Sequence, residues 1–77
     1  MEDKLKEAFA KSLDIPIDKV VDDLTFNSIP AWDSIAHMGL IAELENSFDI
    51  MIETEDVLDM SSVLIAKEII EKYGIKF

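Results

Sequence analysis

Cysteine is absent from the 77-residue sequence, which excludes a disulfide framework and a thiolate metal site as supports for the fold. Only two glycines and two prolines occur, so strand-and-turn architectures are short of turn residues. The apolar runs are only a few residues long, too short for a transmembrane helix. The acidic N-terminus leads straight into an amphipathic segment, which is unlike a signal peptide, and we expect a cytoplasmic protein.

Arginine is also absent, and seven lysines against seventeen acids give a formal net charge of −10. Such a chain is repelled by nucleic acid and by anionic membranes, so its expected partners are proteins with basic patches. The alternative is that the acidity only keeps a small protein soluble. Because 49% of the residues are hydrophobic, a disordered acidic tail is excluded. At this length we expect one domain, residues 1–77, with one modest core.

The spacing of the apolar residues predicts an all-α fold of three main helices and one short helix. The first helix is predicted over about residues 3–13, with Asp3 as a possible cap and Pro16 preventing its continuation. A connection as long as residues 14–33 is uncommon in a compact domain and is usually functional. Its apolar residues indicate that it packs over the core. The apolar stripe of the first helix is Leu5, Ala8, Phe9 and Leu13.

The second helix is predicted to begin at Asp33 or Ser34 and to run to about Ser47. Its broad apolar face is typical of a helix with two or more neighbours. The expected members of this face are Met38, Leu40, Ile41, Ala42, Leu44 and Phe48.

A short helical turn is predicted over about residues 53–58, and a last helix begins near Ser61. Gly74 is placed to end that helix. On its outer side, Glu68 and Lys72 form an expected i,i+4 ion pair. The apolar stripe of the last helix is Val63, Ala66, Ile70 and Tyr73.

Catalysis has little support in this sequence. Ser34 and the sole histidine, His37, share a helix face, which suggests a nucleophile and its base. However, no third group is evidently placed to orient His37, and no oxyanion hole is visible. The acidic runs at 14–18 and 53–56 suggest calcium, but the first run lacks the ligand pattern and glycine of an EF-hand loop, so we expect weak divalent binding and no dedicated metal site. The prediction is a protein that is not an enzyme.

The segment Trp32-Asp33-Ser34-Ile35 places a loop directly before a helix. One interpretation is purely structural, because Asp and Ser are both good N-cap residues. The other is functional, because a serine in the first turn exposes its hydroxyl where the helix dipole favours a phosphate. The motif alone does not separate the two interpretations.

The stretch from Trp32 to Ile50 resembles the acyl carrier protein family around its phosphopantetheine attachment site. Asp33-Ser34-Ile35 matches the family's Asp-Ser-Leu, and Leu44-Glu45 with Phe48-Asp49 matches its Leu-Glu-x-x-Phe-acid pattern in register. The similarity continues through Ile52 and the acids that follow to Met60-Ser61-Ser62-Val63. Together with the first helix and the long loop, it covers essentially the whole chain.

The resemblance implies that a phosphopantetheinyl transferase attaches 4′-phosphopantetheine from coenzyme A to Ser34. The thiol of this arm would hold acyl groups as thioesters for acyl-loading and acyl-processing enzymes. By the same resemblance, Asp33 helps to present Ser34, and Ile35 is an apolar contact for partner enzymes. The acids expected to meet basic patches on those enzymes are Glu43, Glu45, Asp49, Glu53, Glu55 and Asp56.

Two departures from the family bear on the pathway. Fatty-acid carriers usually have acids where this chain has Ala36 and Gly39. Peptidyl carriers usually have Gly-Gly before the modified serine, where this chain has Ala31-Trp32-Asp33. We therefore expect a stand-alone, monomeric carrier for fatty-acid, polyketide or related specialised biosynthesis, whose partners contact Ile35, Ala36 and Gly39. One alternative is an aminoacyl carrier of the peptidyl or D-alanyl type. Another is an acidic docking module that is never modified.

Overall fold

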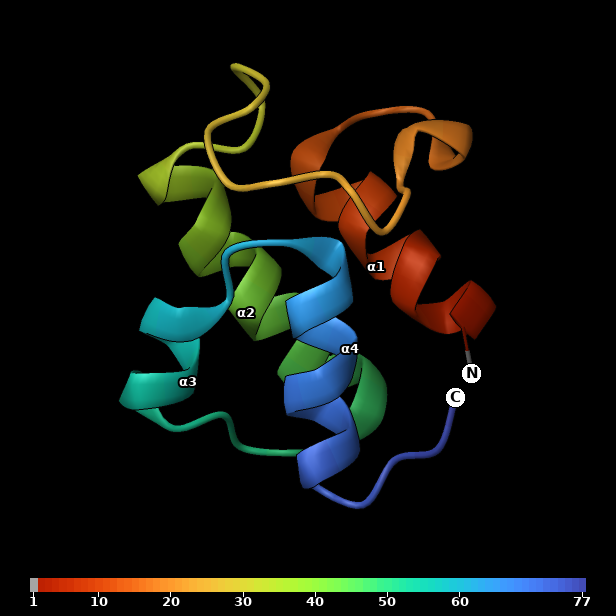
Figure 1. The fold of residues 1–77 in the computed structure, drawn as a ribbon, viewed down its shortest axis with the longest axis vertical. Coiled ribbons are helices and arrows are strands. Elements are labelled where there is room, and N and C mark those ends of the chain that lie inside the picture. Colours follow the sequence, from red (N-terminus) through yellow and green to blue (C-terminus); the bar gives the residue numbers. More distant parts are fainter. Residues whose placement is uncertain (1) are drawn as a thin grey trace.

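The computed structural model describes residues 2–77, and within this range the regular elements are all helices (Figure 1). Three main helices and one short helix confirm the predicted all-α class, and a 3₁₀ turn in the long loop was not predicted. The elements are α1 (Glu2–Leu13), η1 (Ile17–Lys19), α2 (Ser34–Phe48), α3 (Thr54–Asp59) and α4 (Val63–Lys72).

Helix α1 buries the apolar stripe that its sequence predicts, namely Leu5, Ala8, Phe9 and Leu13. The expectation that Asp3 caps this helix is wrong, because the helix already includes Glu2 and Asp3 lies within its first turn. Acids there still favour the positive end of the helix. The helix ends where Asp14 adopts a left-handed conformation (φ 55°) and the Ile15 N–H donates to the Ala10 carbonyl at 3.1 Å.

Helix α2 buries a narrower face than predicted, consisting of Leu40, Ile41, Leu44 and Phe48. Met38, with 66% of its surface exposed, and Ala42 both face solvent, so their placement on the core face was wrong. Each lies two residues from Leu40, and with 3.6 residues per turn this puts them on nearly the opposite side of the helix. Asp49 ends the helix in a left-handed conformation (φ 54°).

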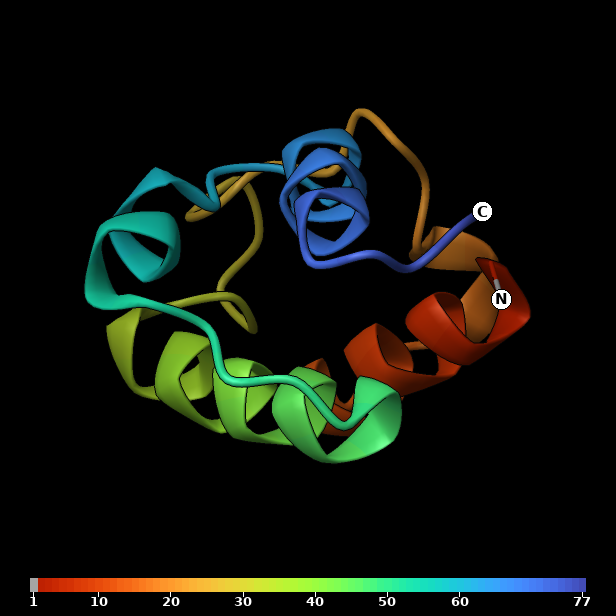
Figure 2. The same cartoon turned by 90° about the horizontal axis from the view of Figure 1, so that it is seen from below.

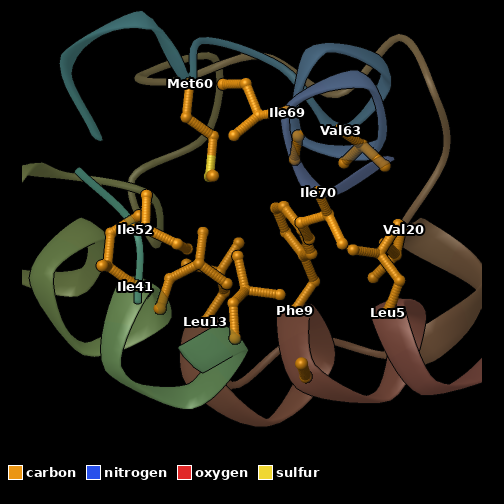
Figure 3. Packing of buried hydrophobic residues seen from close by; sticks show 14 of the residues in the cluster. Leu5, Phe9, Leu13, Val20, Ile41, Ile52, Met60, Val63, Ile69 and Ile70 are labelled. Atoms are coloured by element: carbon orange, nitrogen blue, oxygen red, sulfur yellow. The ribbon is translucent and has the colours of Figure 1, made fainter. Parts of the chain in front are cut away.

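The core lies between α1, α2 and α4, and Figure 2 shows α4 facing the pair formed by α1 and α2. In Figure 3 the side chains of Leu5, Phe9, Ile41, Val63 and Ile70 point into one interior. The long loop packs over this core as predicted, because Val20 and Trp32 are fully buried.

Helix α4 begins at Val63 with Ser62 as its cap, since the Ser62 hydroxyl accepts from the Ile65 N–H at 3.0 Å. Gly74 follows the helix with φ 98°, as its predicted role requires. An isolated bridge joins Thr25 of the long loop to Ser62, the residue that caps α4. The helix buries Val63, Ala66, Ile69 and Ile70, while Tyr73 is half-buried.

None of the helices within residues 2–77 is long and apolar enough to cross a membrane.

Candidate functional site

The start of α2 is capped by Asp33, which leaves the adjacent serine free of that task. The Asp33 Oδ1 atom accepts a hydrogen bond from the Ala36 N–H at 2.8 Å, and the Asp33 carbonyl accepts from the His37 N–H at 2.9 Å. Ser34 is then the first residue of α2, and its side chain is exposed. The hydroxyl therefore stands at the positive end of a fifteen-residue helix, which favours a phosphate bound there.

His37 is held on both sides of its ring and is not available as a base for Ser34. Its Nδ1 atom accepts from the Trp32 indole N–H at 3.0 Å, and its Nε2 atom lies 2.9 Å from the Val57 carbonyl. An indole nitrogen can only donate, so the proton must sit on Nε2 and be donated to Val57. The sequence pairing of Ser34 with His37 as nucleophile and base therefore has no counterpart in the structure.

A pocket of about 260 Å³ opens beside Ser34, between the start of α2, the long loop and α3. Most of its walls are apolar, and its polar groups are hydroxyls and the imidazole, whose two nitrogens are already bonded. The pocket is lined by Phe26, Ser34, His37, Met38, Val57, Leu58, Met60 and Ser61. A group attached to Ser34 would thus lie next to a sheltered apolar space.

Two pocket-lining apolar side chains, Met38 and Leu58, are exposed, and so is Ile35, which follows Ser34 in the chain. Ile35 is 84% exposed, Met38 66% and Leu58 78%. The predicted strip of Ile35, Ala36 and Gly39 is only partly exposed, because Ala36 packs against the core. Gly39 faces solvent, and a Cβ atom added there would meet nothing within 4 Å. Nothing inside this chain therefore requires a glycine at this position.

Three of the predicted partner-binding acids are exposed, namely Asp49, Glu53 and Glu55. They belong to a stretch, residues 33–59, that contains eight Asp and Glu residues and no lysine. Within residues 2–77 no three acidic or histidine side chains come close enough together to hold a metal ion. The exposed acids therefore give the segment from the end of α2 to α3 a negative charge.

Two further predicted acids, Glu43 and Glu45, are half-buried and have partners within the chain. The Glu45 Oε2 atom accepts from the Ile52 N–H at 2.8 Å, which ties α2 to the segment before α3. Glu43 lies 3.6 Å from the Lys11 ammonium group, joining α2 to α1. These two carboxylates contribute to the charge of the surface while also supporting the fold.

Asp56 is the exception among the predicted partner-binding acids, because only 6% of it is exposed. Its Oδ1 atom accepts from the Lys72 ammonium at 2.5 Å, and its Oδ2 atom accepts from the Tyr73 hydroxyl at 2.6 Å. These bonds, that of Lys72 first, hold the pKa of Asp56 below its usual range. Asp56 is therefore an internal anchor of α3 and is unavailable to a partner, which corrects the sequence-based prediction.

The same contacts correct the predicted ion pair of Lys72 with Glu68. Of the ion pairs found within residues 2–77, the one that Lys72 makes is with Asp56. The Tyr73 hydroxyl also accepts from the Glu53 N–H at 3.0 Å, so α4 holds the start of α3 at two points.

Comparison with known proteins gives matches that include this site. A family model described as "Phosphopantetheine attachment site" matches residues 3–64. The acyl carrier protein of Buchnera aphidicola subsp. Acyrthosiphon pisum (strain Tuc7) is 30% identical over 76 residues, which cover 99% of this chain and 95% of that protein. The acyl carrier protein of Streptococcus pyogenes serotype M3 is 34% identical over 64 residues, covering 83% and 85% respectively.

Proposed function

Because this chain belongs to the acyl carrier protein family, whose members are carriers with covalently bound 4′-phosphopantetheine, we propose that Ser34 is the residue that bears this arm. The observation that supports the proposal is that two adjacent residues have different roles at the start of α2. Asp33 caps the helix, and Ser34 presents an exposed hydroxyl at its positive end. When bound, the arm supplies a thiol that holds acyl groups as thioesters.

In the proposed modification the Ser34 oxygen forms a bond to phosphorus, and the bond between the two phosphates of coenzyme A breaks. The hydroxyl proton leaves for a base of the phosphopantetheinyl transferase. The role of this chain is to present the hydroxyl, which Asp33 supports by fixing the first turn of α2. The transferase supplies the catalysis, in agreement with the engaged state of His37.

The pocket favours acyl groups over aminoacyl groups as cargo. An aminoacyl thioester carries an ammonium group, which would need an acidic partner if it were sheltered. The eight residues that line the pocket include no carboxylate, and five of them are apolar. The proposed cargo is therefore an acyl intermediate of fatty-acid, polyketide or related specialised biosynthesis.

For the enzymes that act on this cargo, we propose a contact surface around the pocket mouth. Ile35 and Gly39 would supply its apolar part, beside the half-buried Ala36. The exposed acids Asp49, Glu53 and Glu55, together with the half-buried Glu43 and Glu45, would extend this surface from the pocket along α2 and the start of α3, where they would attract basic patches on those enzymes. Charges of this kind mainly speed the encounter of the partners.

The proposal includes a monomeric carrier domain formed by residues 1–77 and a cytoplasmic location.

Intact-mass analysis after incubation with coenzyme A and a transferase tests the attachment site. Wild type should gain the mass of one phosphopantetheine, and Ser34→Ala should gain none. Because Asp33 is the cap, Ser34→Ala should retain wild-type helicity. Ser61→Ala, which changes another serine of the same pocket, is the matched control and should be modified normally. An unmodified wild-type chain would favour the docking module instead, and a modified Ser34→Ala would move the site.

A second experiment tests whether the missing acid at Gly39 makes this carrier a poor substrate for general fatty-acid enzymes. Gly39→Glu in its holo form should accept malonyl groups from a fatty-acid malonyl transferase faster than wild type, with an advantage that shrinks as salt rises. Gly39→Ala is the control for the change in helix propensity, and the open space at this position accommodates both side chains. Equal loading of all three proteins at low salt would remove Gly39 from the proposed surface.

A further inference from the structure

The geometry points to His37 as a specificity-determining residue that closes the inner end of the pocket beside Ser34 and so limits the length of acyl group that the pocket shelters. This inference rests on the proposed function, because it concerns the cargo attached through Ser34. It assigns a role to a residue that the sequence left without one.

The imidazole of His37 separates the pocket from Trp32, while the buried Met60 lines another part of the pocket wall. His37 lines the pocket, whereas Trp32 does not and is fully buried. The two rings are stacked, with centroids 6.0 Å apart and planes inclined by 24°. On its other side Trp32 packs against Phe9 of α1, with centroids 5.4 Å apart. A chain entering the pocket therefore meets the imidazole before it can reach the aromatic core behind it.

The imidazole of His37 is fixed in position. The Trp32 indole and the Val57 carbonyl hold the two ring nitrogens at 3.0 and 2.9 Å, on opposite sides of the ring. Phe26 adds an edge contact, with centroids 5.4 Å apart. Rotation of the ring would leave the buried indole N–H without its acceptor, which is costly. An aliphatic side chain of similar size would be free to change rotamer, so only a side chain bonded at both ends gives the pocket a defined depth.

The bond to Val57 also sets the width of the pocket. Val57 belongs to α3, and Thr54–Asp59 includes no fully buried apolar side chain that could hold this helix by packing. His37 therefore fixes the wall that α3 contributes as well as the end wall. Lengthening an acyl group should deepen its burial only until the chain reaches the imidazole.

We expect the sheltering of the acyl group to rise with its chain length and then to reach a plateau. Burial of each additional methylene should multiply the equilibrium for sheltering by about four. In wild type this gain should stop at the chain length that fills the pocket. In His37→Ala the space extends toward Trp32, so the gain should continue to longer chains.

The experiment loads wild type, His37→Ala and Val20→Ala with straight-chain acyl groups of increasing length, transferred as acyl-phosphopantetheine from acyl-coenzyme A. Intact mass first verifies loading, so a failure of the proposed attachment appears as an unchanged mass before any plateau is measured. The half-life of each thioester in hydroxylamine then reports its sheltering. Val20→Ala removes buried volume from the core away from the pocket and should keep the wild-type plateau.

A plateau at longer chains in His37→Ala alone supports the inference. The same plateau length in wild type and His37→Ala, or an equal shift in Val20→Ala, would overturn it. If His37→Ala loses its helical circular dichroism, His37→Leu replaces it, because leucine fills similar volume without the two bonds. A plateau for His37→Leu as sharp and as short as that of wild type would also overturn the inference.

Discussion

Helices α1 and α3 are held to the same small domain by different forces. Four residues of α1 are buried and all are apolar, whereas the one buried residue of α3 is Asp56. Helix α3 is held by polar contacts, in which His37 bonds the Val57 carbonyl, while Lys72 and Tyr73 bond Asp56. Because apolar burial is lost only when the core opens, α1 should separate only on global unfolding. Helix α3 can separate when a few bonds break.

The segment that contains α1 and the segment that contains α2 and α3 also differ in net charge. Residues 2–13 contain three acids and three lysines, whereas residues 33–59 contain eight acids and no lysine. Within residues 33–59, α3 therefore combines self-repulsion with weak apolar anchoring, whereas α2 is anchored by buried apolar side chains. The wall of the pocket that α3 provides should therefore cost less to open locally than α1 does.

The largest expected effect concerns the core under α1. Phe9→Ala removes a fully buried ring and should lower the free energy of unfolding by about 3–5 kcal/mol. Leu58→Ala, which truncates an exposed side chain of α3, should stay within about 0.5 kcal/mol of wild type. Urea denaturation measures both. Similar losses of unfolding free energy in the two variants would mean that α3 contributes to the core. The proposed difference in anchoring between α1 and α3 would then be wrong.

The second prediction concerns the contacts of Asp56 with Lys72 and Tyr73, which hold α3 in place. Asp56→Asn removes the charge that binds Lys72 and should raise the hydrogen-exchange rates of α3 amides while leaving those of α1 unchanged. Asp59→Asn is the matched control, since it also neutralises an acid of α3 but one that is exposed. Faster exchange in α1, or no change in α3, would contradict the separate anchoring of the two helices.

Protonation of Asp56 at low pH should weaken its contacts with Lys72 and Tyr73 in the wild-type protein, as the Asp56→Asn substitution does. The Lys72 ammonium and the Tyr73 hydroxyl lower the pKa of Asp56, so its contribution is fully present above the pKa of an unfolded aspartate, about 3.9. The contribution is lost as the pH falls through the lower pKa of the folded state. Relative to the intrinsic exchange rate at each pH, α3 amides should therefore lose protection below about pH 4 in wild type, and this additional loss should be absent from Asp56→Asn.

A smaller and stabilising effect is expected at the exposed glycine of α2. Gly39→Ala should raise the free energy of unfolding by about 1 kcal/mol, because alanine is the better helix former and its Cβ atom meets nothing within 4 Å. Thermal denaturation of the two proteins gives the difference. An unchanged or lower melting temperature would mean that the helix around Gly39 needs the flexibility of glycine.

The smallest effect is that of salt. Glu55 and Asp59 are a like-charged i,i+4 pair within α3, which should cost about 0.2–0.5 kcal/mol when unscreened. Raising sodium chloride should therefore raise the melting temperature and slow exchange in α3 more than in α1. Equal slowing in both helices would show that the charge asymmetry has no local consequence.

The sequence predicted what depends on local periodicity and did poorly on contacts between distant residues. The stripe of α1 is regular and was predicted residue by residue. Met38 and Ala42 were misplaced because apolar character was taken for burial, although the helix turns both away from Leu40. The anchors of α3 join Asp56 to Lys72 and Tyr73, and His37 to Val57, over separations of sixteen to twenty residues. No local sequence pattern indicates such pairs, and Asp56 was therefore predicted to be an exposed, partner-binding acid.

Trp32 gives the molecule an optical property of its own. It is the sole tryptophan, it is fully buried, and its indole N–H is bonded to the residue that ends the pocket. Its fluorescence therefore arises at the boundary between core and pocket, where any displacement of His37 changes the surroundings of the indole. Loading of the carrier and opening of α3 should both be readable as changes in the emission of this one fluorophore, without an added label.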